Sequence, residues 1–139
     1  MMSRFWQNWL SAWCLAVAVF GVLLALGAFP ATDGLVRWLL GRLGGSGDVE
    51  MTQPLRFALA VMGPLSIGWA LTLLAVFRAA VLLGERGRPT WRMVTAAVVG
   101  WYVLDSGLSV ATGHGLNVVP NTLLLATFLL PILRSGVLR

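Results

Sequence analysis

The chain alternates four long apolar segments with short polar ones. The apolar segments cover residues 9–29, 57–77, 93–112 and 116–133, and Asp105 is their only residue charged at neutral pH. A helix that crosses the roughly 30 Å hydrocarbon layer of a bilayer needs about 20 mostly apolar residues. Three segments have 20 or 21 residues and the fourth has 18. The pattern predicts an all-α fold, an antiparallel bundle of four transmembrane helices in a single membrane domain.

The loop after the first segment contains an amphipathic stretch. Its leucines share one broad arc of a helical wheel, with Arg37 on the opposite side. This pattern predicts a short helix over about 33–43 that lies in the membrane interface. Thr32 or Asp33 is its expected N-cap, and the glycine-rich run that follows is a stop signal. A disordered loop is the alternative.

Composition agrees with a membrane protein. Hydrophobic residues make up 58% of the chain and charged residues 11%, whereas soluble domains carry about 25% charged residues. The net charge of +5 suggests nucleic acid at first sight. However, the arginines stand at the ends of apolar segments, where positive charge orients a membrane protein. We therefore expect the lipid bilayer as a partner and no nucleic acid.

The arginines also predict an orientation. If the N-terminus is cytoplasmic, that side receives seven basic residues and the other side three. The positive-inside rule favours this arrangement, with both termini in the cytoplasm. The seven are Arg4, Arg78, Arg86, Arg88, Arg92, Arg134 and Arg139, and the three are Arg37, Arg42 and Arg56.

The first apolar segment admits a second interpretation, as a cleaved signal peptide. Hydrophobic regions of signal peptides run about 7–15 residues, and this one has 21, so retention as a span is favoured. The segment holds Cys14, the only cysteine, which cannot form an internal disulfide. We interpret Cys14 as a small buried apolar residue.

Asp105 is the residue best suited to carry chemistry. Polar residues of the last span, Asn117 and Asn121, lie on one face four residues apart, and Arg56 lies near the same membrane level. Helical spacing places Ser109 on the side of Asp105 and Ser106 next to it. We expect these six residues to form a polar cluster in the external half of the bundle, with an Arg56–Asp105 pair bridged by Asn121.

Two roles are open for this cluster. Polar side chains in lipid often hydrogen-bond between helices and fix their packing. Alternatively, charged residues in spans are costly and mark ligand, ion or proton sites. The sequence favours the structural role without excluding the other.

Other chemistry has little support. His114, the only histidine, lies between two glycines in a loop, and the chain has no second histidine or thiolate partner for a metal or haem. No phosphate-binding glycine loop, nucleophilic triad or paired carboxylates are present. We expect no catalytic residue, no metal and no cofactor.

Small residues at four-residue spacing indicate helix faces that allow close approach. Gly21 and Ala25 form one such pair in the first span, and the third span has two more, Ala96 with Gly100 and Gly107 with Ala111. These faces could bind a second copy of the chain or another membrane protein. Two prolines also carry expectations: Pro64 is expected to kink the second span, and Pro131 to help end the fourth.

The second half of the chain resembles a class of known proteins. The run from Trp101 to Ser106, then Asn117, Asn121 and Thr122 through to Pro131, looks like small four-span bacterial membrane proteins of unassigned activity. The resemblance covers residues 101–131. It implies the fold and a location in the bacterial cytoplasmic membrane, and it implies no reaction.

Three functions follow, in decreasing order of support. The first is a non-enzymatic multi-pass membrane protein that acts as an accessory or assembly subunit of a larger complex. The second is a small carrier or proton-coupled transporter that uses Asp105. A membrane-embedded enzyme is a distant third.

Overall fold

The computed structural model describes residues 2–45, 47 and 49–139, and the described residues form helices and turns with no strand. Four helices are long and apolar enough to cross a membrane. This confirms the predicted all-α fold with four candidate spans. The four are α1 (Arg4–Leu26), α3 (Gln53–Leu82), α4 (Arg88–Ala111) and α5 (Val118–Ser135).

Helix α3 continues beyond the predicted 57–77 at both ends, whereas the other three helices extend past the predicted span at one end and stop short of it at the other; α1, for example, starts at Arg4 and ends at Leu26, before the predicted 29. Hydropathy marks only the part of a helix suited to lipid, whereas helical hydrogen bonds continue into polar flanks. The expectation for Pro131 was wrong, because α5 runs through this residue to Ser135. Pro64 lies inside α3, and the kink expected there stays a prediction.

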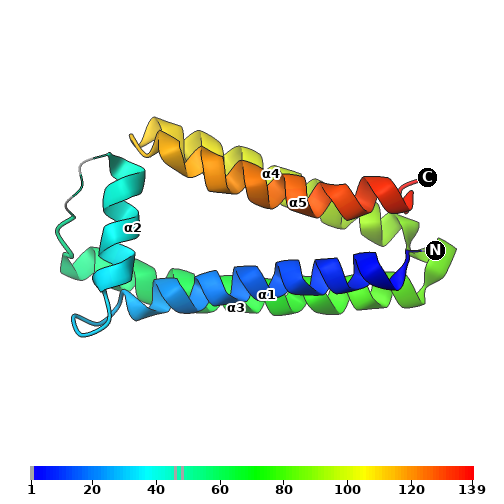
Figure 1. Ribbon diagram of the computed structural model, residues 1–139, viewed down its shortest axis with the longest axis horizontal. Helices are drawn as coiled ribbons and strands as arrows, with labels where there is room; N and C mark the ends of the chain where they lie inside the picture. Colours follow the sequence, from blue (N-terminus) through cyan, green and yellow to red (C-terminus); the bar gives the residue numbers. More distant parts are fainter. Residues whose placement is uncertain (1, 46, 48) are drawn as a thin grey trace.

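The long helices form two antiparallel pairs, α1 with α3 and α4 with α5 (Figure 1). The pairs come together at the end that carries both chain termini, which we call the terminal end. There the 3-10 turn η1 (Gly84–Gly87) joins α3 to α4. The pairs diverge toward the opposite end, which we call the diverging end (Figure 1). The bundle is therefore a wedge of two hairpins.

The α1/α3 pair is held by backbone contact. A Cβ atom placed on Gly21 would lie 2.7 Å from the carbonyl oxygen of Gly63, and one on Gly63 would lie 2.7 Å from the Cβ of Ala25. Real Cβ atoms do not come this close to other heavy atoms. The Gly21–Ala25 face noted in the sequence is thus used inside the chain, against α3.

Aromatic rings join the two pairs at the terminal end. Phe77 of α3 stacks on Trp91 of α4 and on Phe128 of α5, with ring centroids 5.6 and 5.9 Å apart. Trp13 of α1 lies 5.6 Å from the same Phe128 ring. These side chains are the centre of the larger apolar core.

The amphipathic stretch forms α2 (Gly34–Gly44), close to the predicted 33–43. This helix crosses the diverging end from the α1/α3 pair toward the 3-10 turn η2 (Gly115–Asn117) that precedes α5 (Figure 1). Val36 is completely buried in a second small core with Leu24 and Leu59. Asp33 occupies the N-cap position without making a capping hydrogen bond.

Candidate intramembrane polar site

Polar side chains from α4 and α5 meet near the diverging end. Asp105 and Ser109 lie one helical turn apart on α4, with Ser106 beside them. Asn117 ends the turn before α5, and Asn121 follows one turn later. Antiparallel packing of α4 and α5 brings both asparagines to the acid.

The two asparagines and one serine donate hydrogen bonds to the same oxygen of Asp105. Asn121 Nδ2 lies 2.6 Å from Oδ1, Asn117 Nδ2 lies 3.0 Å from it, and the Ser109 hydroxyl lies 3.4 Å from it. The amides also join the serines, Asn117 to Ser109 at 2.9 Å and Asn121 to Ser106 at 3.3 Å. The cluster is a continuous network between the two helices.

Burial is greatest where Asn121 of α5 meets Ser106 of α4. Asn121 and Ser106 are each 8% exposed, and Asp105 is half-buried. Within the part of the chain that the structure describes, no cation lies within ion-pair distance of Asp105, and its Oδ2 accepts no hydrogen bond. The acid is therefore held by neutral donors on one oxygen only.

The predicted Arg56–Asp105 pair is wrong. Arg56 Nη2 lies 2.6 Å from Oδ2 of Asp33, and its Nη1 donates to the carbonyl of Gly27 at 3.3 Å. The reason is geometric: Arg56 begins the helix that pairs with α1, and this pair has diverged from α4/α5 at that level. Arg56 instead fixes the loop that leads into α2.

The network begins where the two helix pairs lose contact. Trp69 of α3 and Trp101 of α4 lie 5.5 Å apart and belong to the edge of the larger core. Asp105 comes one turn beyond Trp101, toward the diverging end. These two tryptophans pack against each other between α3 and α4.

Trp9 and Trp13 join α1 to α5 through hydrogen bonds. Their position at the start of the first span does not predict this contact. Trp9 Nε1 donates to the carbonyl of Thr127 at 2.8 Å, and Trp13 Nε1 donates to that of Leu124 at 2.9 Å. The Thr127 carbonyl lacks its usual helical donor, because Pro131 four residues later has no N–H group. The proline was the only sequence signal for this contact.

The remaining candidate residues stay outside this site. His114 is exposed, and its Nδ1 lies 2.9 Å from the carbonyl of Thr112. Cys14 is buried and free of any disulfide. Among the described residues, no group of three histidine, cysteine or acidic side chains could hold a metal ion.

The network can do two things chemically. It can fix α5 against α4, and it can offer the second carboxylate oxygen to a proton or a small cation. Comparison with known proteins does not decide between them, since no protein family matches the chain and no curated protein or solved structure is similar to it.

Proposed function

We propose that this chain is a non-enzymatic, multi-pass protein of the bacterial cytoplasmic membrane that acts as an accessory or assembly subunit of a larger membrane complex. The observation that carries the proposal is an unused close-packing face on α4. A Cβ atom on Gly100 or Gly107 would have no atom of the described residues within 4 Å. The comparable face of α1, at Gly21, is filled by α3.

The α4 face points away from the chain's own core. At 3.6 residues per turn, Gly100 and Gly107 share a side, and the buried Val98 and the half-buried Asp105 fall on the opposite side. Ala96 and Ala111 extend the small-residue face by one turn in each direction and are exposed. In lipid, where no hydrophobic effect drives helices together, such faces gain van der Waals contact by close approach. A helix of a partner subunit is the occupant we propose.

The arginine distribution supports the proposed orientation. Both termini lie at one end (Figure 1), and the seven-arginine set lies on the helix ends located there, which are the start of α1, the junction of α3, η1 and α4, and the end of α5. Positive charge is retained on the cytoplasmic side. A cysteine introduced at Arg86 should resist a membrane-impermeant thiol reagent in intact cells, whereas one introduced at exposed Gly45 should react. The reverse labelling would refute the orientation.

The test of the assembly role is native mass measurement after gentle detergent extraction. The wild-type chain should appear with additional protein mass. The double variant Gly100→Leu, Gly107→Leu should lose that mass because its side chains fill the close-packing face. Gly68→Leu is the matched control, since Gly68 on α3 also has open space at its Cβ position. A wild-type chain that is strictly monomeric and without partners would refute the proposal.

The unpaired Oδ2 of Asp105 favours a second candidate, a small proton-coupled carrier. Its test is proton flux into proteoliposomes, followed with an enclosed pH-sensitive dye. Asp105→Asn should abolish the flux and leave the helical circular dichroism unchanged. Equal flux in the two proteins would remove this candidate.

A further inference from the structure

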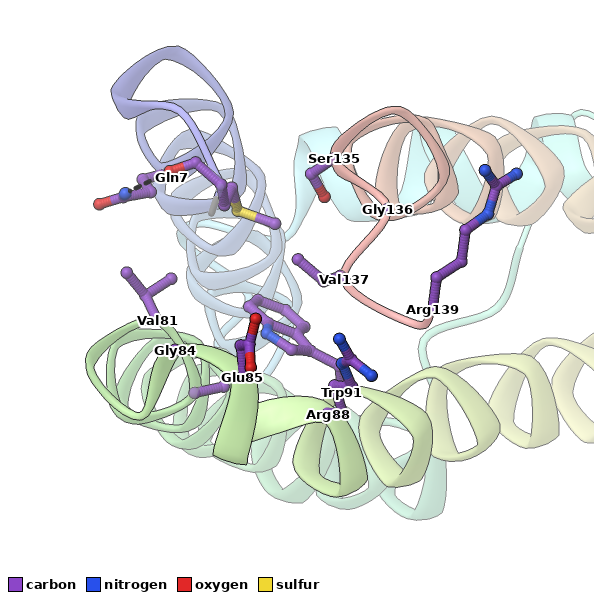
Figure 2. A pocket seen from close by; sticks show the side chains of 12 residues that line it. Gln7, Val81, Gly84, Glu85, Arg88, Trp91, Ser135, Gly136, Val137 and Arg139 are labelled. Atoms are coloured by element: carbon purple, nitrogen blue, oxygen red, sulfur yellow. Dashed lines mark hydrogen bonds between the residues drawn. The ribbon is translucent and has the colours of Figure 1, made fainter.

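A pocket of about 170 Å³ lies at the terminal end of the wedge, opposite the polar site. Figure 2 shows its wall, built from the start of α1, the end of α3, the η1 turn, the start of α4 and the end of α5 with the turn after it. A cavity needs a volume of about 10–15 Å³, measured in the same way, to hold a single water molecule. The pocket therefore has room for a polar group much larger than water.

Charges of both signs line this pocket without neutralising each other. Glu85, Arg88 and Arg139 contribute to the lining. None of the three forms an ion pair within the ranges 2–45, 47 and 49–139. Figure 2 places Glu85 and Arg88 in the middle of the view, and the Arg139 side chain extends outward from the turn after α5. An acid and a base are thus available to a ligand.

The rest of the lining is polar at Gln7 and Ser135 and otherwise mainly apolar or aromatic. Ala80 and Val81 come from α3, Val137 comes from the chain after α5, and the Trp91 ring is almost fully buried. The aromatic residues Phe5, Trp6 and Trp9 stand at the same end of the molecule, at the start of α1. Such rings favour the boundary between water and hydrocarbon. The pocket therefore lies at the level of lipid headgroups.

We propose that this pocket binds the headgroup of an aminophospholipid, a lipid that carries a phosphodiester and a primary ammonium group. The phosphate accepts charge-assisted hydrogen bonds from Arg88, whose side chain lies near Glu85 in Figure 2. The ammonium group donates to the Glu85 carboxylate, and the apolar wall receives the glycerol region. Basic pockets between transmembrane helices are suited to lipid headgroups, and Glu85 adds selectivity against headgroups without an amine.

The occupant follows from this combination of charges. A purely anionic group would meet the Glu85 carboxylate, and a purely cationic group would meet the arginines. A zwitterion in which the two charges are separated by a short linker satisfies both. The inference depends on the chain spanning a membrane and is independent of the proposed assembly role.

The experiment is native mass spectrometry of the full chain released from bilayers of three lipids. The lipids are phosphatidylethanolamine, its N-trimethylated analogue phosphatidylcholine, and phosphatidylglycerol, which has the phosphate without the amine. The wild-type chain should retain phosphatidylethanolamine about tenfold more than either other lipid, the factor given by about 1.4 kcal/mol. Equal retention of the three lipids would overturn the proposal.

Matched variants locate the site. Arg88→Gln should lose most of the retained lipid, whereas Arg86→Gln should not, because Arg86 lies in the same loop and does not line the pocket. Glu85→Gln should keep the phosphate contact and lose the preference for phosphatidylethanolamine. All three side chains are exposed, so the helical content should not change. Equal losses in Arg88→Gln and Arg86→Gln would indicate general charge attraction and overturn the site.

A final arm distinguishes lipid from soluble phosphate. Inorganic phosphate added during release should leave the bound phosphatidylethanolamine in place, because it lacks the ammonium and glycerol contacts. Displacement of the lipid by inorganic phosphate would identify the pocket as a soluble-phosphate site and overturn the lipid assignment.

Discussion

The two helix pairs are held together by different forces. In the α1/α3 pair, glycines bring the backbones into contact at Gly21 and Gly63. In the α4/α5 pair, side chains join the helices through the Asp105 network and a 3.1 Å hydrogen bond between Tyr102 and Thr122. Backbone contact gains dispersion energy from shape alone, whereas the polar network depends on keeping each donor and acceptor matched.

The comparison shows what each pair can tolerate. The contact between α1 and α3 depends on glycines, so any larger residue at these positions disrupts it. It does not depend on a charged side chain. The contact between α4 and α5 depends on the Asp105 carboxylate. It tolerates changes in side-chain size and is weakened when this hydrogen-bond acceptor is lost.

The largest effect is expected from Gly63→Leu. The new side chain must displace the α1 backbone and Ala25, so we expect a loss of about 3 kcal/mol, the upper end of the typical range for overpacked cores. Reversible unfolding in mixed micelles measures the change. Gly68→Leu on the same helix should change stability little, because no atom in the part of the chain that the structure describes lies within 4 Å of its Cβ position. Similar losses in both variants would show that glycine content alone, and not the α1 contact, sets stability.

Replacement of Asp105 should have the next largest effect. Asp105→Leu leaves the amide donors of Asn117 and Asn121 without their acceptor, at a cost of about 1–3 kcal/mol. Asp105→Asn keeps an oxygen acceptor and should cost less than half as much. Unfolding in the same micelles compares the two. If both variants lose the same stability, the carboxylate charge and not the hydrogen bonds holds α5 to α4.

The Trp9–Thr127 bond joins the two pairs and should have a smaller effect. Trp9→Phe removes the Nε1 donor and should cost about 1 kcal/mol. Trp6→Phe is the control, since the Trp6 ring packs on Phe5 at 4.7 Å and donates no hydrogen bond in the part of the structure described.

Pro131→Ala sharpens this test. An alanine restores the helical N–H that Thr127 lacks, so the carbonyl no longer depends on Trp9. In a double-mutant cycle, Trp9→Phe should cost less in the Pro131→Ala background than in the wild type. If the stability losses of Trp9→Phe and Pro131→Ala simply add, the Thr127 carbonyl is not the group through which the two residues act.

The smallest effect is expected from Tyr102→Phe. The bond to Thr122 is exposed, and hydrogen bonds between membrane helices average about 0.6 kcal/mol, so the loss should stay below about 0.5 kcal/mol. Unfolding measurements as precise as those for Trp9 are needed. A loss of stability as large as that of Asp105→Leu would mean that the exposed Tyr102–Thr122 bond, and not the Asp105 network, holds α4 and α5 together.

Much of the polar site follows from helical spacing. Residues four apart share a helix face, so the spacing alone pairs Asp105 with Ser109 and Asn117 with Asn121. Helical spacing does not determine the partner of Arg56, because Asp33 and Asp105 are both expected near the same level of the membrane as this residue. The choice depends on which helices stand side by side.

The order of residues along the chain is enough to specify the four apolar helices and the amphipathic α2, because hydropathy and helical period are properties of consecutive residues. Other features arise only from the packing of whole helices: the divergence of the two pairs, the Arg56–Asp33 bond, the use of Gly63 against α1 and the contact of Trp9 with Thr127. Each of these joins residues that are distant in the chain. Their distances depend on how the helices are arranged in space, and many arrangements are compatible with the same hydropathy.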